Sequence, residues 1–348
     1  MRLRSLIALI SLMALWPQNQ ATAQENAKSA EKQPFIIAIS QIVEHPSLDA
    51  ARQGILDALR DYGFIDGENI SILYKNAQGN ITTSSQIAQN LAANTPKPTV
   101  FVAIGTPTAQ GAISATRGKE IPIVFTAVTD PVSSRLVKDL TTPSKSVTGV
   151  IDYPPLEAQI NLMKSLLHGL KTVGVLYNPG ESNSVSVIKT FKEKAEKEGI
   201  RVIEAPVAKA VDLALAVRKL VGKGVQALYV PQDNTVISAM PQLASLSYFH
   251  KVPVFTSDNG SVKEGAFASI SYSYYTVGRK TGEYIKRVLG GESIENLPIT
   301  TPSTHQLYIN TTAAQALGVE LPENLIETAV LYPEVADHKN QTKVTETS

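Results

Sequence analysis

Cysteine is absent from the 348-residue chain. The sequence therefore has no disulfide framework, no cysteine for lipid attachment and no thiol nucleophile. A large excess of charge of either sign is also lacking, because 32 Lys and Arg stand against 31 Asp and Glu. A chain with this balance has no overall electrostatic attraction to nucleic acid or to an anionic membrane surface. Its binding partners must therefore be inferred from individual sites.

Common catalytic and cofactor motifs are missing as well. The sequence contains no H-E-x-x-H, no G-x-S-x-G and no G-x-x-x-x-G-K-[ST]. The loop GVLYNPGES does not match the dinucleotide fingerprint G-x-G-x-x-G. The histidines are far apart in sequence, and their spacing indicates no metal site: His45, His168, His250, His305 and His338. We predict a protein without catalytic activity, cofactor or metal.

The N-terminal segment has the order of a secretory signal peptide. Arg2 and Arg4 precede an apolar run over residues 6–16, and the small residues Ala-Thr-Ala follow at 21–23. We expect cleavage after Ala23, with an uncleaved membrane anchor as the alternative interpretation. No later segment has the roughly 20 apolar residues that a membrane span needs, so we expect the exported chain to be soluble.

Strand and helix patterns alternate along the rest of the chain. In the stretch KTVGVLYNPGESN, an apolar run stops at Pro-Gly and polar residues open an amphipathic helix. The same order occurs at residues 35–62, so the chain consists of two similar halves. Such alternation predicts parallel sheets with crossover helices. Predicted strands cover residues 35–40, 70–74, 99–104, 121–126, 147–151, 172–177, 201–205, 227–231, 252–256 and 266–271; predicted helices include 47–62, 83–94, 108–117, 275–289 and 312–317, before a last apolar stretch at 326–332.

Six short polar loops follow predicted strands. In open α/β sheets, ligands bind beyond the carboxyl ends of the strands, where helix N-termini offer unpaired backbone N–H groups. Turn formation and helix capping favour the same residue types, and for any single loop this is the simpler interpretation. Six such loops in two similar halves favour a ligand site. The loops are residues 40–46, 105–108, 127–131, 178–183, 232–235 and 257–260.

Several blocks of the sequence carry a family resemblance: SQIVEHPSLDAARQGILDALRDYGFIDGENI, AIGTPTAQGA, IPIVFTAVTDPV, VTGVIDY, VGVLYNPGESNS, YVPQDNTV and the segment from VPVFTSDNG to LGGE. Over residues 35–330 the chain resembles the ABC-transporter substrate-binding family that includes the tryptophan- and tyrosine-binding proteins. The resemblance implies an α/β, type I periplasmic-binding-protein fold. Two Rossmann-like lobes with parallel sheets would be joined by three hinge crossings, near residues 152–155, 271–275 and 297–302, with the ligand in the cleft.

This fold implies a division of the chain and a set of partners. A monomeric periplasmic receptor would deliver a small-molecule ligand to an ABC permease with its ATPase. The predicted parts are a signal peptide at 1–23, a flexible leader at 24–34, an N-terminal lobe at 35–152 plus 273–300, a C-terminal lobe at 153–272 plus 301–335, and a disordered tail at 336–348.

The two charged groups of an amino acid indicate which loop residues can bind it. Its carboxylate needs hydroxyls and N–H groups at helix N-termini, and its ammonium needs a carboxylate. Candidates for the carboxylate are Thr106, Thr108, Ser182 and Asn183. Candidates for the ammonium each end a strand, and Asp258 is favoured because small residues flank it: Asp130, Asp233 and Asp258.

An aromatic ligand side chain would need apolar and aromatic walls. The residues predicted near the cleft are Phe125, Tyr153, Tyr177 and Tyr272. The complete set of candidate ligand-binding residues is Gln41, His45, Thr106, Thr108, Asp130, Tyr153, Asn178, Glu181, Ser182, Asn183, Asp233, Asn234 and Asp258.

We therefore predict the binding component of an ABC importer, whose lobes close on a small zwitterion, foremost an aromatic amino acid. The loop at residues 178–183 is predicted to take part in closure. A periplasmic sensor subunit and a receptor for a nucleoside or a sugar are the alternatives.

Overall fold

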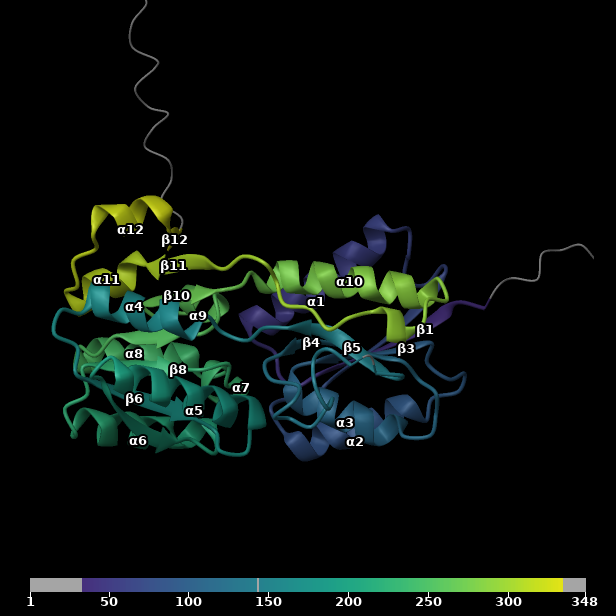
Figure 1. Cartoon of the computed structure of the whole chain (residues 1–348), viewed down its shortest axis with the longest axis horizontal. Helices are drawn as coiled ribbons and strands as arrows, with labels where there is room; N and C mark the ends of the chain where they lie inside the picture. Colours follow the sequence, from purple (N-terminus) through teal and green to yellow (C-terminus); the bar gives the residue numbers. More distant parts are fainter. Residues whose placement is uncertain (1–32, 143, 334–348) are drawn as a thin grey trace, which may run out of the picture. The chain divides into compact units, whose positions relative to one another are not determined.

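The computed structural model describes residues 33–142 and 144–333. The predicted signal peptide, nearly all of the predicted leader and the predicted tail lie outside the described residues. Two β-sheets, each with helices on both faces, organise the described chain (Figure 1). Within these ranges, no helix is long and apolar enough to cross a membrane.

The first sheet has five parallel strands in the order β2-β1-β3-β4-β5. Its central strand reads VFVAI and is completely buried, as is typical of a parallel sheet covered on both faces. Helices α1 and α10 pack on one face, and α2 and α3 pack on the other (Figure 1). The strands are β1 (Phe35–Gln41), β2 (Ile70–Asn76), β3 (Val100–Ile104), β4 (Ile123–Val128) and β5 (Val147–Ile151); the helices are α1 (Pro46–Asp61), α2 (Ile81–Ala92), α3 (Thr106–Thr116) and α10 (Tyr274–Leu289).

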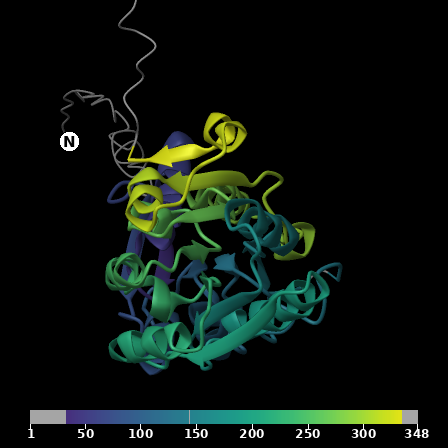
Figure 2. The ribbon, with the colours of Figure 1, turned by 90° about the vertical axis from the view of Figure 1, so that its left-hand side faces the viewer.

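The second sheet has seven strands in the order β12-β11-β10-β9-β8-β6-β7, and only β10 and β11 are antiparallel neighbours. Figure 2 shows the yellow strands β11 and β12 at one edge. Helices α4, α5 and α11 cover one face, and α6 and α8 cover the other. The strands are β6 (Thr172–Tyr177), β7 (Arg201–Pro206), β8 (Ala227–Val230), β9 (Val254–Thr256), β10 (Ala268–Ser271), β11 (Gln306–Asn310) and β12 (Val330–Tyr332); the helices are α4 (Leu156–Leu166), α5 (Ser182–Lys197), α6 (Leu213–Val221), α7 (Asn234–Ile237), α8 (Met240–His250), α9 (Gly260–Lys263), α11 (Thr311–Leu317) and α12 (Glu323–Thr328), with short 3₁₀ helices at Ala210–Asp212 and Ile294–Asn296.

The chain passes between the two sheets three times. It runs from β5 to α4, from β10 to α10, and finally from Thr300, which is bridged to Val150 of β5, to β11. Each sheet with its covering helices therefore forms one lobe, and three crossings join the lobes. The prediction of a type I periplasmic-binding fold is confirmed.

Several element boundaries differ from the sequence-based expectation. Helix α3 begins at Thr106 rather than at residue 108, because Gly105 takes a φ of 96° and turns the chain directly from β3 into the helix. The last apolar stretch divides into α12 and β12. The four-residue helices α7 and α9 show no helical period in the sequence, since they complete little more than one turn.

Helices α1 and α10 approach closely through glycines, although they are far apart in sequence. A Cβ atom on Gly278 would lie 1.9 Å from the Ala51 carbonyl oxygen. We expect Gly278→Ala to destabilise the fold by about 1–3 kcal/mol despite the better helix propensity of alanine, because the backbone of α1 must shift. Urea denaturation measures this, with Gly290→Ala, whose nearest atom would be 3.3 Å away, as control. Equal stability of both variants would contradict the close packing.

Candidate functional site

A small enclosed cavity lies where the carboxyl ends of the strands of both lobes meet. Its volume is about 10 Å³, about the space that one water molecule needs. Sites for drug-sized ligands enclose about 300–1,000 Å³, so these walls must move apart before a ligand enters. The lining residues are His45, Leu48, Thr106, Ala127, Thr129, Asp152, Asn183, Gln232, Asn234, Ile237 and Tyr274.

Five of these residues carry a buried polar atom without a hydrogen-bond partner. Burial of an unpaired polar group costs about 1–3 kcal/mol, so such atoms rarely gather without a ligand to bind. Here they face one cavity from both lobes and from the first crossing. The atoms are His45 Nε2, Thr106 Oγ1, Asp152 Oδ1, Asn183 Oδ1 and Gln232 Oε1.

His45 and Thr106 supply the donors of the first lobe. His45 caps α1, and its Nδ1 accepts the Leu48 N–H at 3.5 Å. Burial lowers the pKa of His45, although Asp258 opposes this, so the ring is neutral at neutral pH and carries its proton on Nε2. Thr106 is the first residue of α3, where backbone N–H groups are also unpaired. These groups suit a ligand anion.

Asp152 is the carboxylate of the cavity. It directly follows β5 at the first crossing and is 2% exposed. The Tyr274 hydroxyl donates to Asp152 Oδ2 at 2.5 Å, which leaves Oδ1 unpaired. Burial raises the pKa of Asp152, and the Tyr274 hydrogen bond only partly opposes the rise. A ligand cation at Oδ1 would replace the solvation that this carboxylate has lost.

Four of the sequence candidates line the cavity: His45, Thr106, Asn183 and Asn234. The aspartates considered for the ammonium lie elsewhere. Asp258 accepts from Ser47 Oγ and twice from Ser261, and Asp233 accepts from Asn178 N, Ser184 Oγ and Val236 N. Asp130 accepts from Ser133 N and Ser186 Oγ. The sequence cannot show that protein donors already occupy these carboxylates.

The other candidates also lie outside the cavity lining. The Thr108 hydroxyl donates to the Ile104 and Gly105 carbonyls of its own helix start. Gln41 donates to Val43 O and to Asp49, and Asn178 donates to Asp233 and Thr235. Glu181 accepts only from protein donors, and Ser182 contacts the opposite lobe.

The predicted aromatic walls do not line the cavity either. Phe125 is buried in the core of the first lobe, and Tyr153 and Tyr177 pack against the core of the second. Tyr272 lies beside His305, with 6.3 Å between ring centroids. The apolar lining consists of Leu48, Ala127, Ile237 and the ring of Tyr274, which sequence reasoning missed.

Hydrogen bonds between α1 and the α9 loop join the lobes on one side of the cavity. Ser47 Oγ donates to Asp258 Oδ2 at 2.5 Å and accepts the Gly260 N–H at 3.0 Å. A Cβ atom on Gly260 would lie 2.7 Å from the Ser47 backbone nitrogen. Only glycine allows this approach of the lobes.

A second set of hydrogen bonds joins α5 to the first lobe. Ser186 Oγ donates to Asp130 Oδ2 at 2.5 Å. Ser182 Oγ lies 2.9 Å from Ser134 Oγ and accepts from Gln110 Nε2 at 3.3 Å. The lobes are therefore in contact on two sides, and the structure is a closed one.

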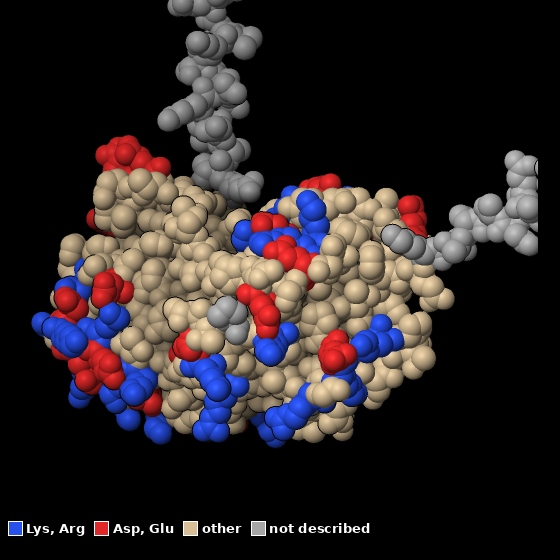
Figure 3. All heavy atoms as spheres, turned by 45° about the vertical axis from the view of Figure 1, so that its right-hand side comes forward, with Lys and Arg blue, Asp and Glu red and all other residues tan. Residues whose placement is uncertain are grey.

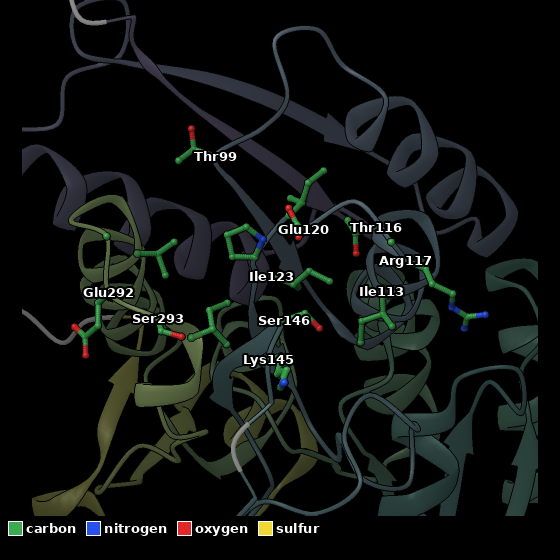
Figure 4. A pocket seen from close by; sticks show the side chains of 16 residues that line it. Thr99, Ile113, Thr116, Arg117, Glu120, Ile123, Lys145, Ser146, Glu292 and Ser293 are labelled. Carbon is green, nitrogen blue, oxygen red and sulfur yellow. The ribbon is translucent and has the colours of Figure 1, made fainter.

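A larger groove, of about 840 Å³, lies at the opposite, amino edge of the first sheet. Its side chains include Arg117, Lys145 and Glu292, and Figure 4 shows Arg117 and Glu292 extending outward on opposite sides. None of the buried unpaired polar atoms of the described chain belongs to its lining. The lining of this groove therefore lacks the unpaired buried polar atoms that make the small cavity a candidate ligand site.

Charges of both signs are scattered over the face shown in Figure 3, and broad areas of that face carry neither. This face therefore lacks the continuous basic surface that binds nucleic acid. Among the residues the structure describes, no three His, Asp or Glu side chains are placed to hold a metal ion together.

Comparison with known proteins gives a consistent family match. The family model described as ABC transporter substrate binding protein matches residues 36–331. The chain is also 38% identical over 313 residues to a protein named tyrosine-binding protein from Clostridioides difficile, covering 89% of each chain.

Two solved structures differ in their overall similarity to this chain. An ABC domain from Streptococcus pneumoniae in complex with L-Trp has 36% identity and a TM-score of 0.80, covering 86% of this chain and 99% of that one. A substrate-binding protein with adhesive properties from Clostridium difficile, ligand-free and open, has 39% identity but a TM-score of 0.64, covering 85% and 99%. The higher score against the ligand complex agrees with the hydrogen bonds that join the lobes here. Sugar-binding proteins of ABC transporters, at 15% and 14% identity, share the fold alone.

Proposed function

The chain belongs to the ABC transporter substrate-binding protein family, and we propose that it captures an aromatic amino acid outside the cytoplasm for an ABC importer. The receptor would act as a monomer and deliver its ligand to a membrane permease with its ATPase. It would need no cofactor and would carry out no reaction.

The main support for this proposal is that unpaired donors and unpaired acceptors lie on different sides of the cavity. Donors that suit a carboxylate come from the first lobe, at His45 and Thr106. Acceptors that suit an ammonium come from the first crossing and the second lobe, at Asp152, Asn183 and Gln232. A zwitterion satisfies both sets only when the lobes are closed, so its binding favours closure.

Two observations support an aromatic side chain on the ligand. Relatives with 38% and 36% identity are a tyrosine-binding protein and a protein in complex with L-Trp. The non-polar lining of Leu48, Ile237 and the Tyr274 ring offers apolar contact area to a flat side chain.

A thermal-shift panel tests the ligand class. At a concentration 100 times its dissociation constant, a ligand should stabilise the chain by about 2.7 kcal/mol. We expect L-tyrosine, L-tryptophan or L-phenylalanine to raise the melting temperature clearly. Sugars and nucleosides should leave it unchanged, and the proposal is wrong if one of them raises it while the aromatic amino acids do not.

Ligand affinity should also depend on pH through Asp152. Burial raises the pKa of this carboxyl above its ordinary 3.8, and only the ionised form attracts an ammonium. Affinity should therefore be highest above the raised pKa and should fall as the pH drops through it, with uptake of a proton by the ligand-free protein. Calorimetric titrations across the acidic range measure this. An Asp152→Asn variant with the same pH profile would exclude Asp152 as the group responsible.

A further inference from the structure

We infer that the cavity requires a primary ammonium on its ligand, and that Glu181 helps to set this requirement without lining the cavity, by orienting the amide group of Asn183. The inference rests on the proposed function and deepens it, because it limits the ligand to amines with three N–H bonds. Glu181 is thus a positioning residue.

Glu181 is 3% exposed and precedes α5. Its Oε2 accepts from Asn234 Nδ2 at 2.6 Å, from Asn234 N at 3.1 Å and from Asn183 Nδ2 at 3.3 Å. Its Oε1 accepts from the Thr235 backbone nitrogen and hydroxyl at 3.0 and 2.9 Å. Backbone N–H groups donate to both Glu181 oxygens, so these oxygens act as acceptors, and both asparagine amides turn their NH₂ groups toward them.

Backbone carbonyls take up the remaining amide donors. Asn183 Nδ2 also donates to Gln232 O at 2.6 Å, and Gln232 Nε2 donates to Asp152 O at 2.9 Å. With their NH₂ groups bound, Asn183 and Gln232 can turn only oxygen toward the cavity. Both oxygens are buried and unpaired, as is Asp152 Oδ1. The site therefore presents three acceptors.

Three acceptors match the three N–H bonds of a primary ammonium. An N-methyl group replaces one donor with a methyl and leaves one acceptor unpaired in a closed cavity. The surrounding charge favours a cation too, since no Lys or Arg belongs to the cavity lining. Behind the lining, burial and, to a smaller extent, the neighbouring Glu181 raise the pKa of Asp233 to about 8.

The first experiment compares L-tyrosine with N-methyl-L-tyrosine on the unmodified chain by calorimetry. We expect the N-methyl compound to bind at least about tenfold more weakly, the effect of one lost hydrogen bond to a charged group. If L-tryptophan is the stronger ligand, N-methyl-L-tryptophan replaces the tyrosine derivative. Binding of the parent amino acid with equal binding of its N-methyl form overturns this inference alone. Absence of binding by any aromatic amino acid overturns the proposed function instead.

The second experiment asks whether Glu181 is responsible. Glutamine at this position can present an NH₂ group in place of Oε2, and the Asn183 amide must then turn its oxygen away from the cavity to meet it. In Glu181→Gln the affinity ratio between the primary and the N-methylated amino acid should shrink by about tenfold. A purely structural role would weaken both ligands equally and leave the ratio unchanged, which would refute the assignment. The control is Glu198→Gln at the end of α5, which bonds Lys164 and should keep the original ratio. If Glu181→Gln does not fold, the N-methyl comparison still decides the requirement for a primary ammonium.

Discussion

Replacement of Asp152 by asparagine is expected to weaken amino-acid binding by at least about 100-fold, or about 3 kcal/mol, because it removes the carboxylate from a buried charge pair. Asparagine has nearly the same shape and can still accept the Tyr274 hydroxyl, so the cavity should keep its form. What is lost is the negative charge that faces the ligand ammonium. Calorimetric titration of the variant measures the loss.

The same substitution should not destabilise the ligand-free protein. The folded-state pKa of Asp152 is raised by burial, so the charged form of this carboxyl is disfavoured in the folded chain, and asparagine removes that penalty. We therefore expect an unchanged or higher melting temperature together with weaker binding. Glu68→Gln, in an exposed turn of the first lobe, should alter neither. Weak binding accompanied by a lower melting temperature would indicate damage to the fold instead.

Gly260→Val should prevent complete closure of the lobes. In the closed structure a Cβ atom here would lie 2.4 Å from Ser47 Oγ and 2.7 Å from the Ser47 nitrogen, both in the opposite lobe. The clash exists only when the lobes are in contact, so its cost of about 1–3 kcal/mol falls on the closed state. Because the ligand makes its contacts to both lobes only when they close, affinity should drop by about 5–150-fold. Small-angle scattering should show a smaller ligand-induced compaction than in the parent chain.

Gly260→Val should affect closure of the lobes and not their folding. Each lobe keeps its own core, so the melting temperature of ligand-free Gly260→Val should match that of the parent. Gly278→Ala provides the contrast, because its clash with Ala51 lies inside one lobe and should lower stability. Parent-like affinity and compaction in Gly260→Val would show that the lobes close in a different geometry.

The fold class could be predicted from the sequence because it depends on patterns that repeat. Parallel strands buried on both faces are nearly continuous apolar runs, as in VFVAI of β3, and polar loops follow each of them. The loops also indicated the edge of both sheets where the cavity lies, since His45, Thr106, Asn183 and Asn234 line it.

The roles of individual carboxylates could not be predicted in the same way. Asp233 and Asp258 follow strands just as Asp152 does, yet Ser184, Ser261 and other protein donors occupy them. Some of these hydrogen bonds join residues that are far apart in sequence, such as Ser47 and Asp258, so no local sequence pattern predicts them. The family resemblance implies a hinge in the segment after β5, and no sequence pattern marks its Asp152 as a ligand-binding residue.

The most direct test is a crystal structure of the chain with bound L-tyrosine or L-tryptophan. We expect closed lobes, with the ligand nitrogen within hydrogen-bond distance of Asp152 Oδ1, Asn183 Oδ1 and Gln232 Oε1 and the carboxylate at Thr106 and His45. A ligand bound outside this cavity, or one whose carboxylate faces the second lobe, would contradict it.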